Sequence, residues 1–154
     1  MKNYKIFSIP RHIIPDLSEE AGIEQFWEMY DDECQRKRLY LKDKVLSDIL
    51  SLSGLGLGFQ RKGNNTIHYI RYNLKHGKYI IDEHRDSCNI TIIIYLSKSN
   101  SVSDQFWVEK NKIDMNKVWK NNNEYQCLIF WGNSPHHGKI HGEGSREILC
   151  FFTD

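Results

Sequence analysis

Six short apolar segments in the later part of the chain constrain the fold more than any other feature of the sequence. From residue 66 onward they are rich in β-branched and aromatic residues, and clusters of Gly, Asn and Ser separate them. The segments cover 66–74, 78–84, 89–97, 104–109, 125–132 and 145–152. Many short strands with turn signals between them are typical of an antiparallel β-sandwich or barrel.

The first part of the chain carries a helical periodicity instead. Capping residues stand near Asp16 and Ser18, and apolar side chains follow at helical spacing. The spacing predicts two helices, over 17–31 and 36–52, and the glycine-rich stretch "SGLGLGF" ends the second. The fold class expected is therefore mainly β with N-terminal helices.

The length of 154 residues fits a single domain. We expect this domain to cover 1–154, with helical support from 1–60 and the β core from 66–154. The tract 110–124, rich in lysine and asparagine, is expected to be a solvated loop with one short strand.

Charge and hydropathy argue against several partners. Lys and Arg number 21 against 20 for Asp and Glu, which gives no electrostatic reason to bind nucleic acid or an anionic membrane. The apolar runs are far shorter than the roughly 18 residues that a membrane-spanning helix needs, and the first residues show no secretory signal. The four cysteines form no CxxC pair, which indicates reduced thiols in a cytoplasmic protein; a zinc site or a disulfide framework is the alternative.

The stretch "DEHRDS" at 82–87 places ionisable side chains directly before the apolar segment 89–97. Such groups beside a core cost free energy unless they are paired, hydrated or bound to a metal. In an extended chain, His84 and Asp86 point to the same face, so an imidazole and a carboxylate can meet one cation. An ordinary solvated turn is the alternative.

A third ligand has to come from elsewhere, and the densest histidine cluster is "SPHHGKIHGEGSR", after segment 125–132. Two histidines and one carboxylate on a β scaffold form the facial triad of non-heme Fe(II) oxygenases, which leaves coordination positions open. His136 and His137 are both candidates for the third ligand. The remaining histidines are expected to be loop, surface or structural residues: His12, His68, His76 and His141.

Arg146 stands at the start of the last apolar segment, where a charged side chain looks out of place. Arginine is suited to bidentate capture of a carboxylate. An ion pair with Glu143 or Glu147 at the strand end is the alternative.

The ordered motifs over 66–154 resemble those of the 2-oxoglutarate/Fe(II)-dependent oxygenases, and within them the prolyl-hydroxylase-like group. The resemblance rests on an H-x-D motif before one hydrophobic strand and an H-x-G motif after another, followed by a glycine and a basic residue. The residues that carry it are Tyr72, Gly77, Tyr79, His84, Asp86, Tyr95, Leu96, His136, Gly138, Gly144 and Arg146.

This resemblance implies a double-stranded β-helix, a jelly-roll or cupin-like core flanked by α-helices. It implies that Fe(II) is held by His84, Asp86 and a distal histidine. His136 fits the H-x-G pattern and the ten-residue step to Arg146, and His137 is the alternative distal ligand.

The same resemblance implies how the co-substrate binds and what the protein does. Arg146 would pair with the C5 carboxylate of 2-oxoglutarate, and Tyr72 or Tyr95 would donate a hydrogen bond to it. The activity would be hydroxylation of an unactivated C–H bond, with release of succinate and CO₂ and with ascorbate as an accompanying reductant. The substrate would be a peptide or protein side chain, an amino acid or a small metabolite, and the oligomeric state stays open.

Two other kinds of protein fit the same barrel. One is a non-catalytic, cupin-like metal-binding or sensing protein. The other is a metal-dependent hydrolase or isomerase, which would work without 2-oxoglutarate or O₂.

Overall fold

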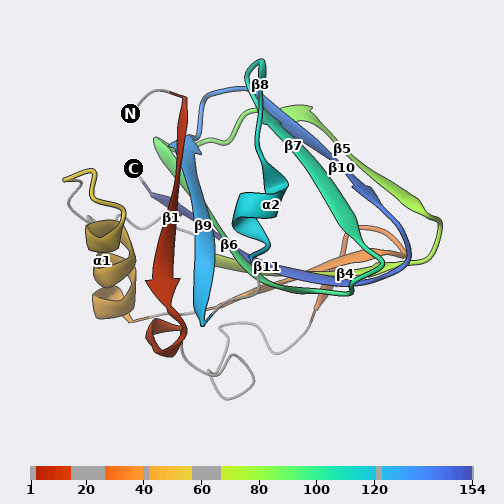
Figure 1. Cartoon of the computed structure of the whole chain (residues 1–154), viewed down its shortest axis with the longest axis horizontal. Helices are drawn as coiled ribbons and strands as arrows, with labels where there is room; N and C mark the ends of the chain where they lie inside the picture. The colour runs from red at the N-terminus through yellow and green to blue at the C-terminus, as the bar shows by residue number, and fades with distance from the viewer. Residues whose placement is uncertain (1–2, 15–26, 40–41, 57–66, 121–122, 154) are drawn as a thin grey trace.

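The computed structural model describes residues 3–14, 27–39, 42–56, 67–120 and 123–153, and these form a mainly antiparallel β structure in two sheets (Figure 1). The larger sheet has the strand order β1-β9-β6-β11-β4-β3-β2 and the smaller sheet the order β5-β10-β7-β8. Strands of the larger sheet are β1 (Tyr4–Pro10), β2 (Glu28–Met29), β3 (Cys34–Arg38), β4 (Ile67–Leu74), β6 (Ile90–Lys98), β9 (Glu124–Trp131) and β11 (Gly144–Thr153). Strands of the smaller sheet are β5 (Lys78–His84), β7 (Ser103–Val108), β8 (Asn111–Lys112) and β10 (His136–His141).

The larger sheet is covered on both faces. Helix α1 (Asp43–Leu52) packs one side of it with Leu46, Ile49 and Leu50, and a short 3-10 helix η1 (Arg11–Ile13) follows β1. The smaller sheet covers the other side, so that α1 and the strands β5, β7 and β10 lie on opposite sides of the larger sheet in Figure 1. The arrangement is a β-sandwich with a helix on its outer face.

Strand β6 shows why this sequence needs two apolar layers. Its side chains alternate, with Ile92 and Ile94 packing on the α1 side and Ile93 and Tyr95 packing between the sheets. A strand buried on both faces reads as a continuous apolar run, which is the pattern "ITIIIY". Strand β10 faces the core with one side only, and its residues alternate between buried and half-buried.

All six strands expected from the sequence after residue 65 are confirmed, as β4, β5, β6, β7, β9 and β11. The tract 110–124 contains the short strand β8, as expected, and also the helix α2 (Met115–Val118), where Asp114 accepts a hydrogen bond from the Asn116 N–H over 3.1 Å. Strand β10 was not expected, because its histidines and glycine suggested a turn.

The helical expectation for the first part of the chain is wrong in several places. The predicted helix 36–52 is correct only from Asp43, because Cys34–Arg38 pairs with β4 as a strand. Of the predicted helix 17–31, residues 17–26 lie outside the described residues, and Glu28–Met29 is the edge strand β2. Strand β1 pairs with β9 across the sequence, and this long-range pairing left no local periodic signal.

Among the described residues there is no helix with the length and apolar character that crossing a membrane requires.

Candidate metal centre

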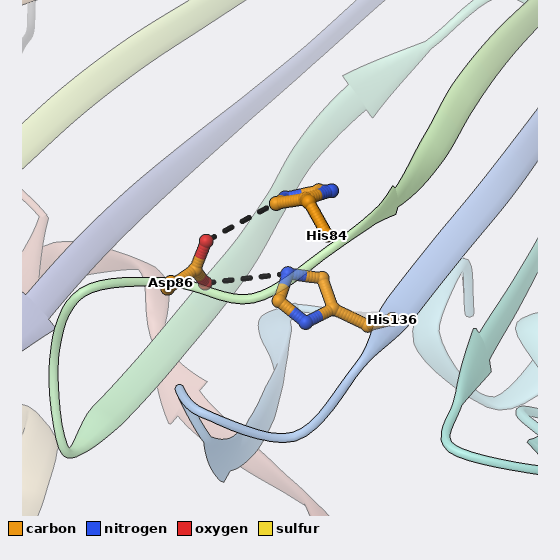
Figure 2. A group of neighbouring side chains, drawn as sticks. All are labelled: His84, Asp86 and His136. Carbon is orange, nitrogen blue, oxygen red and sulfur yellow. Dashed lines mark ion pairs between the residues drawn. The ribbon is translucent and has the colours of Figure 1, made fainter.

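Three potential metal ligands, His84, Asp86 and His136, come together in the structure (Figure 2). They line a cavity between the two sheets. The Nε2 atom of His84 lies 3.5 Å from Oδ1 of Asp86, and the Nε2 atom of His136 lies 3.3 Å from Oδ2. One donor atom from each of the three residues lies within 4.8 Å of the other two. The set contains two imidazole nitrogens and one carboxylate, which is the donor set of a facial triad.

The smaller sheet positions the two histidines. His84 ends β5, His136 begins β10, and the two residues are direct partners across these strands, with ring centroids 4.3 Å apart. Asp86 lies in the loop after β5, where its N–H donates a hydrogen bond of 2.7 Å to the carbonyl of Gly132. The strand ends at His84, and Asp86 in the following loop still brings its carboxylate to the same place as the His84 ring, as the H-x-D spacing predicted.

Both imidazoles are oriented in the same way by the backbone. The Nδ1 atom of His84 lies 2.7 Å from the carbonyl oxygen of Asp82, and Nδ1 of His136 lies 2.8 Å from that of Ser134. A carbonyl only accepts hydrogen bonds, so Nδ1 of each ring carries a proton, and Nε2 is the ring atom turned toward Asp86. Metal-bound histidines in proteins are held by contacts of this kind.

The carboxylate of Asp86 is held by a hydroxyl as well as by the histidines. Thr91 Oγ1 donates a hydrogen bond of 2.7 Å to Oδ2. Burial alone would raise the pKa of the Asp86 carboxyl, but the hydrogen bonds from His136, His84 and Thr91 outweigh it and hold that pKa below its usual range. The hydrogen bond to Asp86 raises the pKa of His84. The arrangement therefore keeps an anion facing two imidazoles.

The neighbouring residue His137 points away from this group. Its ring stacks on Trp107 with centroids 4.6 Å apart and planes 5° from parallel. The structure thus brings His136, and not His137, to His84 and Asp86. His141 ends β10, while His12 and His76 are exposed at the surface.

The cavity has a volume of about 260 Å³ and connects the three potential ligands with Arg146, Tyr72 and Tyr95. These three residues are buried, and the Arg146 guanidinium carbon lies 4.9 Å from the ring centre of Tyr72 and 5.9 Å from that of Tyr95. Burial raises the pKa of both tyrosines, so their hydroxyls stay protonated near neutral pH. The expected co-substrate residues therefore line the same cavity as the potential metal ligands.

Two buried polar atoms of this group have no partner among the described residues: Nη1 of Arg146 and the hydroxyl of Tyr95. Both are hydrogen-bond donors, and a buried donor without a partner costs free energy. A bound acceptor such as a carboxylate would satisfy both atoms, so the residues present fit one end of 2-oxoglutarate.

Arg146 also has an ionic partner that the sequence did not indicate. Its Nε donates a hydrogen bond of 2.8 Å to Oδ2 of Asp104 on β7, and Trp119 Nε1 donates to the same oxygen over 2.9 Å. The expected alternatives, Glu143 and Glu147, are not the partners, because Glu147 pairs with Arg71 and Arg146 points into the sandwich. Burial would lower the pKa of Arg146, but the charge of Asp104 outweighs it and keeps that pKa raised.

His68 is a further cavity residue, and of the expected surface and structural roles the structure gives it a buried one. It is buried on β4, its Nε2 atom has no partner among the described residues, and its ring packs edge-on against Phe152 with centroids 5.5 Å apart. Burial and the charges of Arg36 and Arg38 lower the pKa of His68 to about 4. A neutral imidazole therefore lines the cavity.

A second group of potential ligands, Asp32, Glu33 and His76, holds the turn between β4 and β5. Glu33 Oε2 accepts hydrogen bonds from the backbone N–H groups of Lys75 and His76, over 2.9 and 3.3 Å. The His76 ring pairs with Asp32 at the surface. These contacts explain the cluster as a turn support.

No family model and no curated protein matches the chain. Among solved structures, a C-terminally truncated thymine-7-hydroxylase from Neurospora crassa in its apo form matches with a TM-score of 0.40 and 12% identity over 79% of this chain. IDO from Bacillus thuringiensis matches with a TM-score of 0.42 and 12% identity over 97% of this chain. The chain spans 62% of the Neurospora hydroxylase chain and 72% of the IDO chain, and likenesses this weak carry no conclusion about its activity.

Proposed function

We propose that this chain is a metal-dependent dioxygenase that uses Fe(II) and 2-oxoglutarate to hydroxylate a C–H bond. The observation that carries the proposal is the convergence of His84, Asp86 and His136 on one face of the cavity that Arg146 and Tyr95 also line. Two imidazoles and a carboxylate suit Fe(II) and leave positions open for a second ligand and O₂.

The strand order supports a double-stranded β-helix as the core. Strands β4 to β11 fall into two four-stranded sets, β9-β6-β11-β4 and β5-β10-β7-β8. The chain alternates between the sets at nearly every step, as in a jelly roll built from two Greek keys. His84 and His136 then lie at neighbouring strand ends, at one mouth of the sandwich.

The residues that line the cavity would have separate roles in this reaction. His84, Asp86 and His136 would hold the metal, while Nη1 of Arg146 and the Tyr95 hydroxyl would orient the distal carboxylate of 2-oxoglutarate. Bound Fe(II) and 2-oxoglutarate would supply O₂ activation, with release of succinate and CO₂. The apolar walls of the cavity, including Phe106 and Phe130, would exclude water from the reacting centre.

The substrate would occupy the part of the cavity away from Arg146. His68 lines this space with a neutral imidazole, so it would offer a hydrogen bond to a substrate atom. The volume of about 260 Å³ suits a side chain or a small metabolite. A peptide side chain, a free amino acid and a small metabolite are the substrate classes we propose.

Anaerobic spectroscopy of the purified protein tests the proposal. Adding 2-oxoglutarate to the Fe(II) protein should produce a weak visible charge-transfer band, and admitting O₂ with ascorbate should yield succinate. Asp86→Ala should abolish both signals, whereas Asp82→Ala should keep them, because Asp82 contacts His84 through its backbone carbonyl only. A wild-type protein that binds Fe(II) but gives neither band nor succinate would contradict the proposal.

A cupin-like metal-binding or sensing protein is the second candidate, and one observation favours it. Arg146 already has the anionic partner Asp104, so its charge is balanced without a co-substrate. Such a protein would bind the metal through the same three residues and would give no 2-oxoglutarate-dependent band.

A further inference from the structure

The buried ion pair between Arg146 and Asp104 joins the two sheets at the wall of the cavity. Asp104 belongs to β7 in the smaller sheet and Arg146 to β11 in the larger one. Their side chains are 2% and 4% exposed, so water screens neither charge. The neighbouring Tyr72 and Tyr95 are protonated and Trp119 is neutral, so the pair leaves this wall with no net charge.

Because this wall of the cavity has no net charge, it should favour different ligands from those that an unpaired arginine would bind. A carboxylate placed against an unpaired buried arginine gains a charge–charge attraction, which is strong where water is excluded. Here the carboxylate of Asp104 offsets that attraction, since both anions would face one guanidinium. What remains for a ligand is hydrogen bonding, because Nη1 of Arg146 and the Tyr95 hydroxyl are donors without a partner among the described residues, and Oδ1 of Asp104 is an acceptor without one. A carboxamide can accept from the two donors and donate to Oδ1, whereas a carboxylate can only accept.

We propose that Asp104 sets the charge selectivity of the Arg146 subsite, so that the protein accepts a 2-oxo acid with a neutral, hydrogen-bonding distal group. The inference rests on the proposed function, because it concerns how a 2-oxo acid is held beside the metal. Asp104 is a positioning residue here: it acts on the ligand through Arg146, which it holds by the Nε hydrogen bond.

A matched pair of ligands tests the inference on the wild-type protein. N-oxalylglycine has the shape of 2-oxoglutarate and ends in a carboxylate, and N-oxalylglycinamide differs only in ending in a neutral carboxamide. Binding of each to the Mn(II)-loaded protein is measured by titration calorimetry, without any turnover. We expect the two dissociation constants of the wild type to agree within about tenfold, because the wall has no net charge.

The variant Asp104→Asn then removes the charge and keeps an oxygen that can accept from Arg146 and Trp119. Its preference for N-oxalylglycine over the carboxamide should rise by about tenfold or more, because Arg146 is left as an unbalanced buried cation. Asp114→Asn is the matched control, since Asp114 is an exposed carboxylate beside α2 and asparagine preserves its capping role. This control should keep the wild-type ratio.

Two outcomes would overturn the inference alone, and a third would overturn the proposed function as well. A wild-type preference for the carboxylate of about a hundredfold or more would overturn the inference, even if Asp104→Asn fails to fold. An Asp104→Asn ratio equal to that of the wild type would overturn it as well. If the Mn(II)-loaded wild type binds neither ligand, the proposed function fails and the inference fails with it.

Discussion

Thr91 on β6 donates a hydrogen bond of 2.7 Å to Asp86, which lies in the loop after β5. Thr91 is 2% exposed, so water does not replace this donor. The bond engages Oδ2, the oxygen that faces His136, while Oδ1 faces His84. The larger sheet thereby orients the one anionic ligand of the candidate metal centre.

Replacing Thr91 should therefore weaken metal binding without touching a ligand. Thr91→Val keeps the shape of the side chain and removes the hydroxyl, and we expect a loss of about 10–100-fold in Mn(II) or Zn(II) affinity. Thr91→Ser keeps the hydroxyl and should bind nearly as the wild type does. Competition with a fluorescent chelator measures both, and equal affinities for Val and Ser would show that the hydroxyl does not position Asp86.

The two adjacent histidines of β10 should respond in opposite ways to substitution. His136→Ala removes an Nε2 atom that faces Asp86, so metal affinity should fall by about a hundredfold or more. His137→Ala removes a ring stacked on Trp107, which should leave metal affinity near that of the wild type. Metal titration of the two variants in parallel checks this, and a larger loss in His137→Ala would assign the distal ligand to His137.

Breaking the buried ion pair from the other side should destabilise the fold. Arg146→Met leaves the Asp104 carboxylate buried with Trp119 as its remaining partner, and we expect a loss of about 3–5 kcal/mol in the free energy of unfolding. The double variant Asp104→Leu with Arg146→Met removes both charges and should recover a large part of this loss. Urea unfolding of the metal-free protein measures the cycle. Additive effects of the two substitutions would show that the pair is not coupled.

The buried imidazole of His68 should make stability depend on pH. Its pKa falls from the ordinary value of 6.5 to about 4 on folding, so between these values the unfolded chain binds more protons than the folded one. Stability from this group is therefore complete above pH 6.5 and is lost as the pH falls toward 4.

Unfolding of wild type and His68→Gln across this pH range measures the effect. The wild type should lose stability more steeply than the variant as the pH falls, because glutamine does not titrate. His12→Gln, at an exposed position, should follow the wild type. Identical slopes for wild type and His68→Gln would contradict the assigned burial cost.

The secondary structure could be predicted best for strands whose side chains meet the same surroundings along the whole strand. The run at β6 could be read directly, because each of its two faces packs on an apolar layer. The H-x-G glycine also has a local reason: a Cβ on Gly138 would lie 3.0 Å from the Gln105 carbonyl oxygen and 3.1 Å from the ring of Phe106. Close packing of β10 against β7 thus favours a residue without a side chain at this position.

Long-range pairings could not be read in this way. The polar stretch "CQRKR" becomes strand β3 because β4 offers it hydrogen bonds, and nothing within those residues indicates that partner. Asp104 and Arg146 meet although 42 residues separate them. One local signal was present, since Asp104 stands two residues before the buried Phe106 and so shares its inward face.

The origin of the three potential ligands has a mechanical consequence. His84 and His136 belong to the smaller sheet, whereas Asp86 is tied to the larger sheet by Thr91 and by the carbonyl of Gly132 after β9. An ion held by all three would cross-link the two sheets at one mouth of the sandwich, while the Arg146–Asp104 pair joins them elsewhere in the sandwich. Any movement that separates the sheets at this mouth would have to break a bond between the ion and one of its ligands.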